Sequence, residues 1–199
     1  MESAESLARF PGEDEHVGAT AGQDPLMRYV ELRRHTDNEG DRLTSQGVED
    51  AEMIGRDRLQ PPYVAFVSTG AARATQMLEI LRHAVGQDAI PITVAAGLRS
   101  SVEDRWRQAA KAAGKGADLE AMRAIDSDLV ERESWLLASA LRQVVEALPE
   151  GGRALVVGHS PTSEAAVLGL AGQVIRTLGK GEGILLTEDG EGYQVELLD

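Results

Sequence analysis

The chain has 199 residues, 42% of them hydrophobic and 27% charged, which suits one globular domain with a sizeable core. It contains no cysteine, which excludes disulfide scaffolds, cysteine-ligated zinc and thiol nucleophiles and fits a cytoplasmic location. The net charge of −13 disfavours nucleic acid and anionic membranes as partners, because an acidic surface repels phosphate groups. No apolar run approaches the ~20 residues of a membrane-spanning helix, and the first residues lack the pattern of a secretory signal.

The chain begins with an acidic segment that differs from the rest. Residues 1–24 carry six acidic side chains and one basic side chain, and their apolar residues follow no period. We therefore expect a solvated arm there and a folded domain over 25–199. Within the domain, apolar runs indicate strands at 27–32, 63–67, 92–95, 154–157, 183–187 and 193–198.

Apolar residues at helical spacing lie between these strands. Thr44 is suited to cap the first helix. Residues 96–152 carry no strong strand signal, and we expect two or three helices there. The periodicity predicts helices over 45–59, 71–86, 130–148 and 162–171. The alternation predicts a single three-layer α/β domain, with a mainly parallel central sheet flanked by helices and a helical insertion at about 96–150.

Basic side chains and histidines follow three of the predicted strands. Arg34 and His35 follow the first strand, Arg73 follows the second, and His159 follows the strand at 154–157. Because sites in such sheets lie beyond the carboxyl ends of the strands, we expect these residues to meet at one edge. Guanidinium groups bind phosphoryl oxygens in pairs, and a neutral imidazole can attack phosphorus. The set therefore suits a phosphoryl group, and since no metal-ligand spacing is present, we expect no metal and no cofactor.

Four sequence blocks resemble the histidine phosphatase superfamily, also called the phosphoglycerate mutase-like proteins. YVELRRHTDN resembles its strand and Arg-His-Gly motif, and LTSQGVEDA resembles the helix start that follows. VSTGAARATQM resembles its Ser-Pro-x-x-Arg-Ala-x-Gln-Thr segment, and ALVVGHSP resembles the strand that carries the second histidine. The four blocks stand in the family's order. Thr36 replaces the family's glycine, and Thr69–Gly70 stands in place of its usual proline.

The resemblance implies a metal-independent phosphatase that forms phosphohistidine on His35. Arg34, Arg73 and His159 would complete the phosphate pocket. The insertion at about 96–150 would then be a lid over that pocket.

The resemblance leaves the proton donor for the leaving group open. Many relatives use a glutamate after the third strand, which favours Glu103, with Asp104 beside it. A SixA-like branch of phosphohistidine phosphatases has an acidic residue close behind the Arg-His motif, where this chain has Asp37. We expect Glu103 to be the acid. Arg99 could reach a substrate carboxylate, but the pattern favours a solvated surface position.

Other functions remain open besides that of a metal-independent phosphatase. A protein phosphohistidine phosphatase and phosphotransfer of the phosphoglycerate mutase type would use the same groups. The departures at Thr36 and Thr69–Gly70 keep an inactive phosphate-binding scaffold in view. The expected partner is a small phosphorylated substrate or a phosphohistidine protein, and the sequence leaves a homodimer open.

Overall fold

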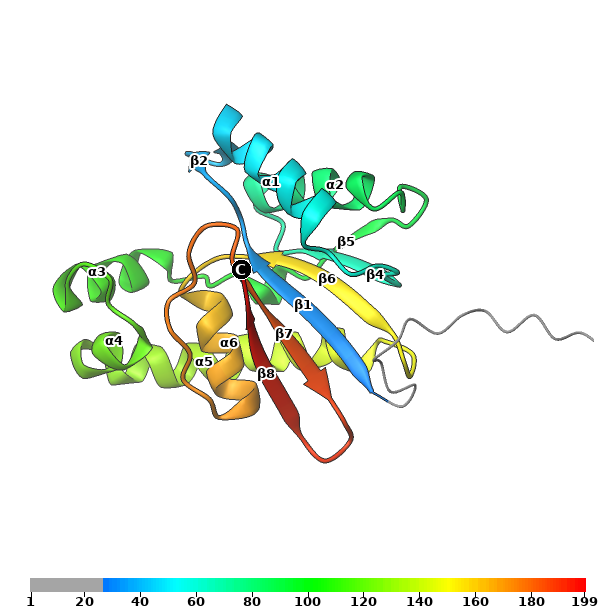
Figure 1. Ribbon diagram of the computed structural model, residues 1–199. Helices are drawn as coiled ribbons and strands as arrows, with labels where there is room; N and C mark the ends of the chain where they lie inside the picture. Colours follow the sequence, from blue (N-terminus) through cyan, green and yellow to red (C-terminus); the bar gives the residue numbers. More distant parts are fainter. Residues whose placement is uncertain (1–26) are drawn as a thin grey trace, which may run out of the picture.

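The computed structural model describes residues 27–199, which form one sheet with helices on both faces (Figure 1). The acidic arm expected at 1–24 lies outside the described residues. The sheet consists of β1 (Arg28–Arg34), β4 (Ala65–Ser68), β5 (Ile92–Val94), β6 (Arg153–Gly158), β7 (Gly183–Glu188) and β8 (Tyr193–Leu198). Their spatial order is β5-β4-β6-β1-β7-β8. The predicted strands are all present, with small shifts of their ends.

The four strands β5, β4, β6 and β1 are parallel, whereas β7 and β8 join antiparallel. Gly190, with φ +83°, lies between β7 and β8, where a short turn reverses the chain. In the register, Arg34 pairs with Gly158 and Ser68 pairs with Val157. The strands β1, β4 and β6 therefore end at one level, and the residues that follow them are neighbours.

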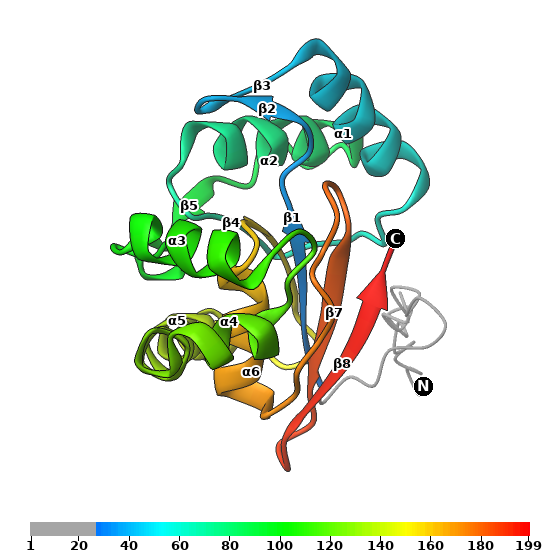
Figure 2. The ribbon, with the colours of Figure 1, turned by 90° about the vertical axis from the view of Figure 1, so that its left-hand side faces the viewer.

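The helices divide between the two faces of the sheet, as Figures 1 and 2 show. They are α1 (Ser45–Asp57), α2 (Ala72–Ala84), α3 (Glu103–Ala113), α4 (Leu119–Ile125), α5 (Ser127–Glu146), α6 (Thr162–Ala171) and the short 3-10 helix η1 (Ala96–Leu98). α1 and α2 cover one face, and α5 and α6 cover the other. The Thr44 side chain accepts a hydrogen bond from the Gly47 amide, so the predicted cap of α1 is confirmed.

Alternating side chains along β6 divide the core. Leu155 and Val157 pack toward α1 and α2, whereas Ala154 and Val156 pack toward α5 and α6. All four side chains are fully buried. Burial of each valine or leucine contributes roughly 1.5–3 kcal/mol. Cover on both faces explains why this strand is a continuous apolar run in the sequence.

The helical insertion expected at about 96–150 is present, but its parts differ in position. α5 belongs to the helical layer, because Leu137 and Leu141 are buried in the main core. α3 and α4 lie at one side of the domain in Figure 1. None of the helices within 27–199 has the length and apolar character needed to cross a membrane.

A short hairpin that the sequence did not predict precedes α1. It joins β2 (Asn38–Glu39) to β3 (Arg42–Leu43), and its two-residue strands are too short to give a periodic signal. The hairpin places Asp41 beside the first turn of α2, where its carboxylate meets the Ala72 amide at 3.2 Å.

Candidate active site

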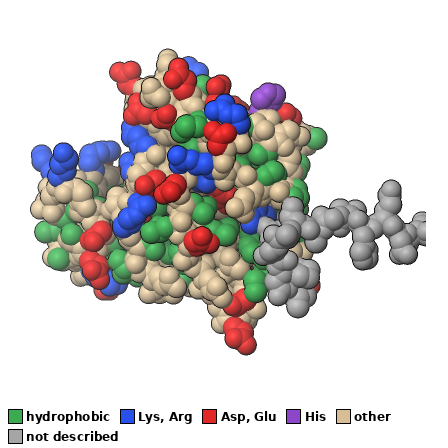
Figure 3. Space-filling model, in the orientation of Figure 1, with side chains coloured by type: hydrophobic (Ala, Val, Ile, Leu, Met, Phe, Trp, Pro, Cys, Tyr) green, Lys and Arg blue, Asp and Glu red, His purple; other side chains and the backbone are tan. Residues whose placement is uncertain are grey.

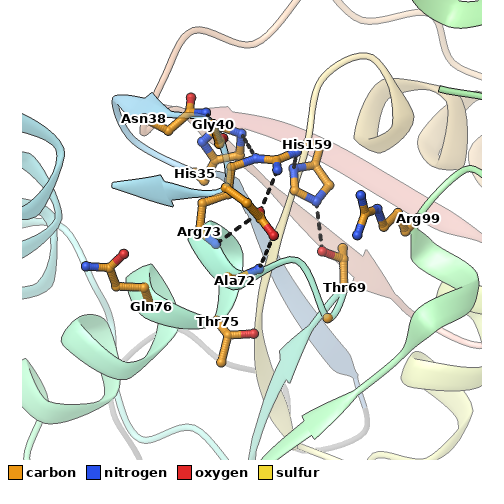
Figure 4. Close-up of polar contacts among 12 residues, drawn as sticks. His35, Asn38, Gly40, Thr69, Ala72, Arg73, Thr75, Gln76, Arg99 and His159 are labelled. Atoms are coloured by element: carbon orange, nitrogen blue, oxygen red, sulfur yellow. Dashed lines mark hydrogen bonds and ion pairs between the residues drawn. The ribbon is translucent and has the colours of Figure 1, made fainter. Parts of the chain in front are cut away.

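Two histidines meet at the carboxyl edge of the sheet. His35 directly follows β1 and His159 directly follows β6, so the level strand ends bring them together. Their ring centroids are 5.2 Å apart with an interplanar angle of 63°. Both side chains are buried, at 6% and 7% exposure. Residues far apart in sequence thus form one cluster, as Figure 4 shows.

Arg73, in the first turn of α2, joins the two histidines. Its Nε lies 3.1 Å from His35 Nε2, and its Nη2 lies 3.2 Å from His159 Nδ1. A guanidinium only donates, so both ring nitrogens that face it are acceptors in this arrangement. The donors and the two rings surround one point at the end of the sheet, and the geometry suits an anion with several oxygens.

The tautomer of His35 follows from its backbone partner. His35 Nδ1 lies 2.8 Å from the carbonyl oxygen of Thr36, which can only accept, so Nδ1 carries the hydrogen. His35 Nε2 therefore keeps its lone pair. Burial, followed by the positive charges of Arg73 and Arg34, lowers the pKa of His35 to about 4. A neutral imidazole with a free Nε2 is the form that attacks phosphorus.

Thr36 fits the first loop, where it replaces the glycine of the family's motif. Its hydroxyl donates to the carbonyl oxygen of Gly47 at 2.7 Å, and its side chain is buried. Within residues 27–199, no residue other than glycine has a positive φ. The backbone conformation at Thr36 therefore does not require a glycine.

His159 is held from its other side by Thr69, the residue after β4. His159 Nε2 lies 2.8 Å from Thr69 Oγ1. Because Arg73 donates to Nδ1, the Nε2 hydrogen is directed to the threonine hydroxyl. Burial, the charge of Arg73 and the neighbouring His35 lower the pKa of His159 to about 3. Gly70 has φ +85°, which a proline cannot adopt, so the turn after β4 could not form with a proline at position 70.

The two arginines at the end of β1 point to different places. Arg34 Nη1 donates to the Leu178 carbonyl at 2.5 Å, and Arg34 contacts neither histidine ring within hydrogen-bond distance. Its charge still contributes to the lowered pKa of His35. Arg33 is buried on the opposite side, where its Nε lies 2.7 Å from Glu31. The structure thus gathers His35, His159 and Arg73, whereas the Arg34 guanidinium bonds to the Leu178 carbonyl.

The three candidate acids lie in different surroundings. Glu103 begins α3 and lines a cavity of about 280 Å³ together with Arg73 and His159. Asp104 pairs with Arg107, has an 84% exposed side chain and does not line that cavity.

Asp37 lies two residues after His35, next to the start of α1. Its carboxylate pairs with Lys180 and accepts from the Thr44 hydroxyl at 2.8 Å. The hydrogen bond from Lys180, and after it that from Thr44, lowers the pKa of Asp37. The carboxylate form of Asp37 is therefore favoured. Of the three acids, only Glu103 lines the cavity that Arg73 and His159 also line.

One residue at the site, Asp41, was not recognised from the sequence. Asp41 accepts a hydrogen bond from Arg73 Nη1 at 2.8 Å, and no motif marked it. Arg99 has a 40% exposed side chain, in line with the surface position that the sequence favoured, and it also lines the cavity and donates from Nε to Glu103 at 2.6 Å. Figure 4 shows its guanidinium beside His159.

A wider cleft of about 1040 Å³ continues from the cavity between the end of β4 and α3, with Thr69, Arg99 and Glu103 among its lining residues. Figure 3 shows Lys and Arg side chains gathered over α3, although the whole chain has a net charge of −13. In the lining of the wider cleft, Arg99 and Arg105 stand beside Glu103 and Asp104. In the described part of the chain, no group of three or more His, Asp or Glu side chains is arranged to hold a metal ion.

Solved structures share this arrangement of strands and helices. Phosphoglycerate mutase from Bacillus anthracis str. Sterne has a TM-score of 0.68 at 18% identity, over 86% of this chain and 92% of that chain. A mycobacterial glucosyl-3-phosphoglycerate phosphatase has a TM-score of 0.57 at 16% identity, over 86% and 97% of the two chains. The protein histidine phosphatase SixA, solved with tungstate, has a TM-score of 0.51 at 16% identity, over 86% and 96%.

The sequence alone finds no such relative, since no protein-family model and no curated protein matches the chain. At identities below 20%, the likeness to the solved structures establishes the shared fold. The predicted fold class is confirmed by the parallel strands, the two helical layers and this likeness. The chain has the fold of the phosphoglycerate mutase-like histidine phosphatases.

Proposed function

We propose that the protein is a metal-independent phosphatase that hydrolyses a phosphomonoester through a phosphohistidine intermediate. The observation that carries this proposal is the position of His35 Nε2, which is unprotonated, 3.1 Å from Arg73 Nε and next to the His159 ring. The solved structures with the same fold are a mutase and two phosphatases by name, and this supports phosphoryl chemistry in general.

In the first step, His35 Nε2 attacks phosphorus and the bond from phosphorus to the leaving oxygen breaks. Arg73 binds the equatorial oxygens, where charge is concentrated, and His159 lies beside them. Glu103 gives a proton to the leaving oxygen. In the second step, Glu103 takes a proton from water, the water oxygen attacks phosphorus, and the N–P bond breaks to release phosphate and restore His35.

The low pKa values of the two histidines fit this sequence of steps. Burial lowers the pKa of His35 to about 4 and that of His159 to about 3, so both rings are neutral at pH 7. A protonated His35 would have no lone pair for phosphorus, so burial keeps the nucleophile available over a wide pH range.

The test is hydrolysis of an aryl phosphate with and without EDTA. We expect activity that resists the chelator and is lost in His35→Ala. His83→Ala is the matched control, because His83 is an exposed histidine on α2 that pairs only with Asp88. Loss of activity with EDTA and recovery with a divalent cation would favour a metallophosphatase, and unchanged activity in His35→Ala would refute the proposal.

A phosphohistidine protein is the second candidate substrate, favoured by the open cleft of about 1040 Å³ next to the cavity. A small phosphomonoester needs only the cavity of about 280 Å³, whereas a protein chain needs the cleft. The same assay, run with a phosphohistidine protein and with a set of small phosphomonoesters, separates the two. Phosphate binding without turnover of either would instead identify an inactive scaffold.

A further inference from the structure

The first turn of α2 lacks a side-chain cap of its own. Its N-cap residue is Ala71, whose methyl group cannot accept a hydrogen bond. Asp41, from the turn between β2 and β3, takes this place. Asp41 Oδ2 accepts from the Ala72 amide at 3.2 Å, and Oδ1 lies 3.5 Å from the Arg73 amide. The backbone amides at the start of α2 therefore hold the carboxylate independently of its contacts with side chains.

The same carboxylate also contacts the guanidinium that serves the two histidines. Asp41 Oδ1 accepts from Arg73 Nη1 at 2.8 Å. The other two nitrogens of Arg73 face His35 at 3.1 Å and His159 at 3.2 Å. Because a guanidinium is planar and rigid, a bond that holds Nη1 also sets the direction of Nε and Nη2.

The charge of Asp41 suits this contact. The Asp41 side chain is 52% exposed; partial loss of hydration works against ionisation, but hydrogen bonds from Ala72 and Arg73 outweigh it and lower the pKa of the Asp41 carboxyl. Asp41 is thus a carboxylate at neutral pH, and its bond to Arg73 is charge-assisted. The Arg73 side chain is only 17% exposed, so few other orientations are open to it.

We propose that Asp41 is a positioning residue, held by the N-terminus of α2, that orients Arg73 so that its Nε and Nη2 meet the phosphoryl group at His35 and His159. The proposal rests on the proposed function and assigns to Asp41 no contact with the substrate. Misplacement of a catalytic group by about 1 Å can lower a rate by ~10²-fold, so loss of this contact should be visible in catalysis.

The test is a double-mutant cycle on Asp41 and Arg73, read as kcat/KM for an aryl phosphate. We expect Asp41→Ala to lower kcat/KM by roughly 10–100-fold. In the Arg73→Ala background the same change should alter kcat/KM less than about 3-fold, because the group that Asp41 orients is gone. Asp41→Asn keeps one acceptor oxygen, and its kcat/KM should lie between those of the wild type and Asp41→Ala.

A matched control separates orientation from the stability of a helix end. Thr44→Ala removes the cap of α1, and it should lower the melting temperature much as Asp41→Ala does. It should leave kcat/KM within about 3-fold of the wild type, since Thr44 has no contact with Arg73. An equal loss of kcat/KM in Thr44→Ala and Asp41→Ala would show that Asp41 acts only on stability, and would overturn the proposal.

Two further outcomes of the double-mutant cycle lead to different conclusions. If Asp41→Ala lowers kcat/KM as strongly in the Arg73→Ala background as in the wild type, Asp41 acts independently of Arg73 and the proposal is wrong. If the wild type has no hydrolase activity, the proposed function fails, and the cycle is read from the dissociation constant of inorganic phosphate by calorimetry. The Asp41 proposal then predicts the same non-additivity in binding, and additive effects would refute it.

Discussion

A drop in pH from 7 to 5 should destabilise the protein through its two buried histidines. In the folded state the pKa is about 4 for His35 and about 3 for His159, below the ordinary value of 6.5. The unfolded chain therefore binds more protons than the folded chain once the pH falls below about 6.5. The stability that the neutral rings provide is present above that pH and is lost as the pH falls toward the two folded values.

The size of the effect follows from these values. At pH 5 an unfolded histidine is almost fully protonated, whereas both folded rings are still neutral. Linkage gives a loss of about 2 kcal/mol for each histidine between pH 7 and pH 5, or roughly 4 kcal/mol together. This is a large part of the total stability of an ordinary domain.

Urea unfolding at pH 7 and at pH 5 measures this loss. The control is the double variant His35→Asn/His159→Asn, in which the carboxylates still titrate but the two imidazoles are absent. The free energy of unfolding should fall by roughly 4 kcal/mol less in the variant than in the wild type. If both proteins lose the same free energy, the two histidines titrate normally in the folded state, and the account of a neutral nucleophile held by burial is refuted.

Three substitutions test the roles of the remaining groups. Glu103→Gln should slow hydrolysis of an alkyl phosphate by ~10²–10⁴-fold and spare an activated aryl phosphate, whose leaving group needs little protonation. Asp37→Asn should show no such difference between the substrates, and the opposite pattern in kcat/KM would move the acid to the first loop. Arg73→Lys should lower kcat/KM by ~10²–10³-fold, because an ammonium group cannot contact the sides of His35 and His159 together and about two charge-assisted bonds are lost. A loss below ~10-fold would show that one positive charge is enough there.

The part of the site that could be predicted consists of residues next to strand ends. His35 and His159 directly follow β1 and β6, so recognising two apolar runs was enough to place the rings at one edge. Arg73 could be placed in the same way, because it lies in the first turn after β4. These positions follow from the parallel order of the sheet and need no knowledge of side-chain direction.

The rest depends on loops that carry no periodic pattern. The Arg34 guanidinium turns to the carbonyl of Leu178, in the connection between α6 and β7, and no local rule predicts that contact. Asp41 lies beside α2 because the hairpin of β2 and β3 folds back. Each of its strands has only two residues, which is too short for a periodic hydrophobic pattern, so the sequence did not predict it. The contact of Glu103 with Arg99 depends on the directions of two charged side chains near the start of α3, which the charged sequence at 99–107 does not fix.

Direct detection of the phosphorylated enzyme tests the central claim most simply. The protein is mixed with a ³²P-labelled phosphomonoester in EDTA, quenched in alkali, which preserves phosphohistidine, and digested for mass spectrometry. We predict acid-labile label on the peptide that carries His35, and none in His35→Asn. Turnover of the substrate without any labelled histidine, or label that persists in His35→Asn, would contradict the account.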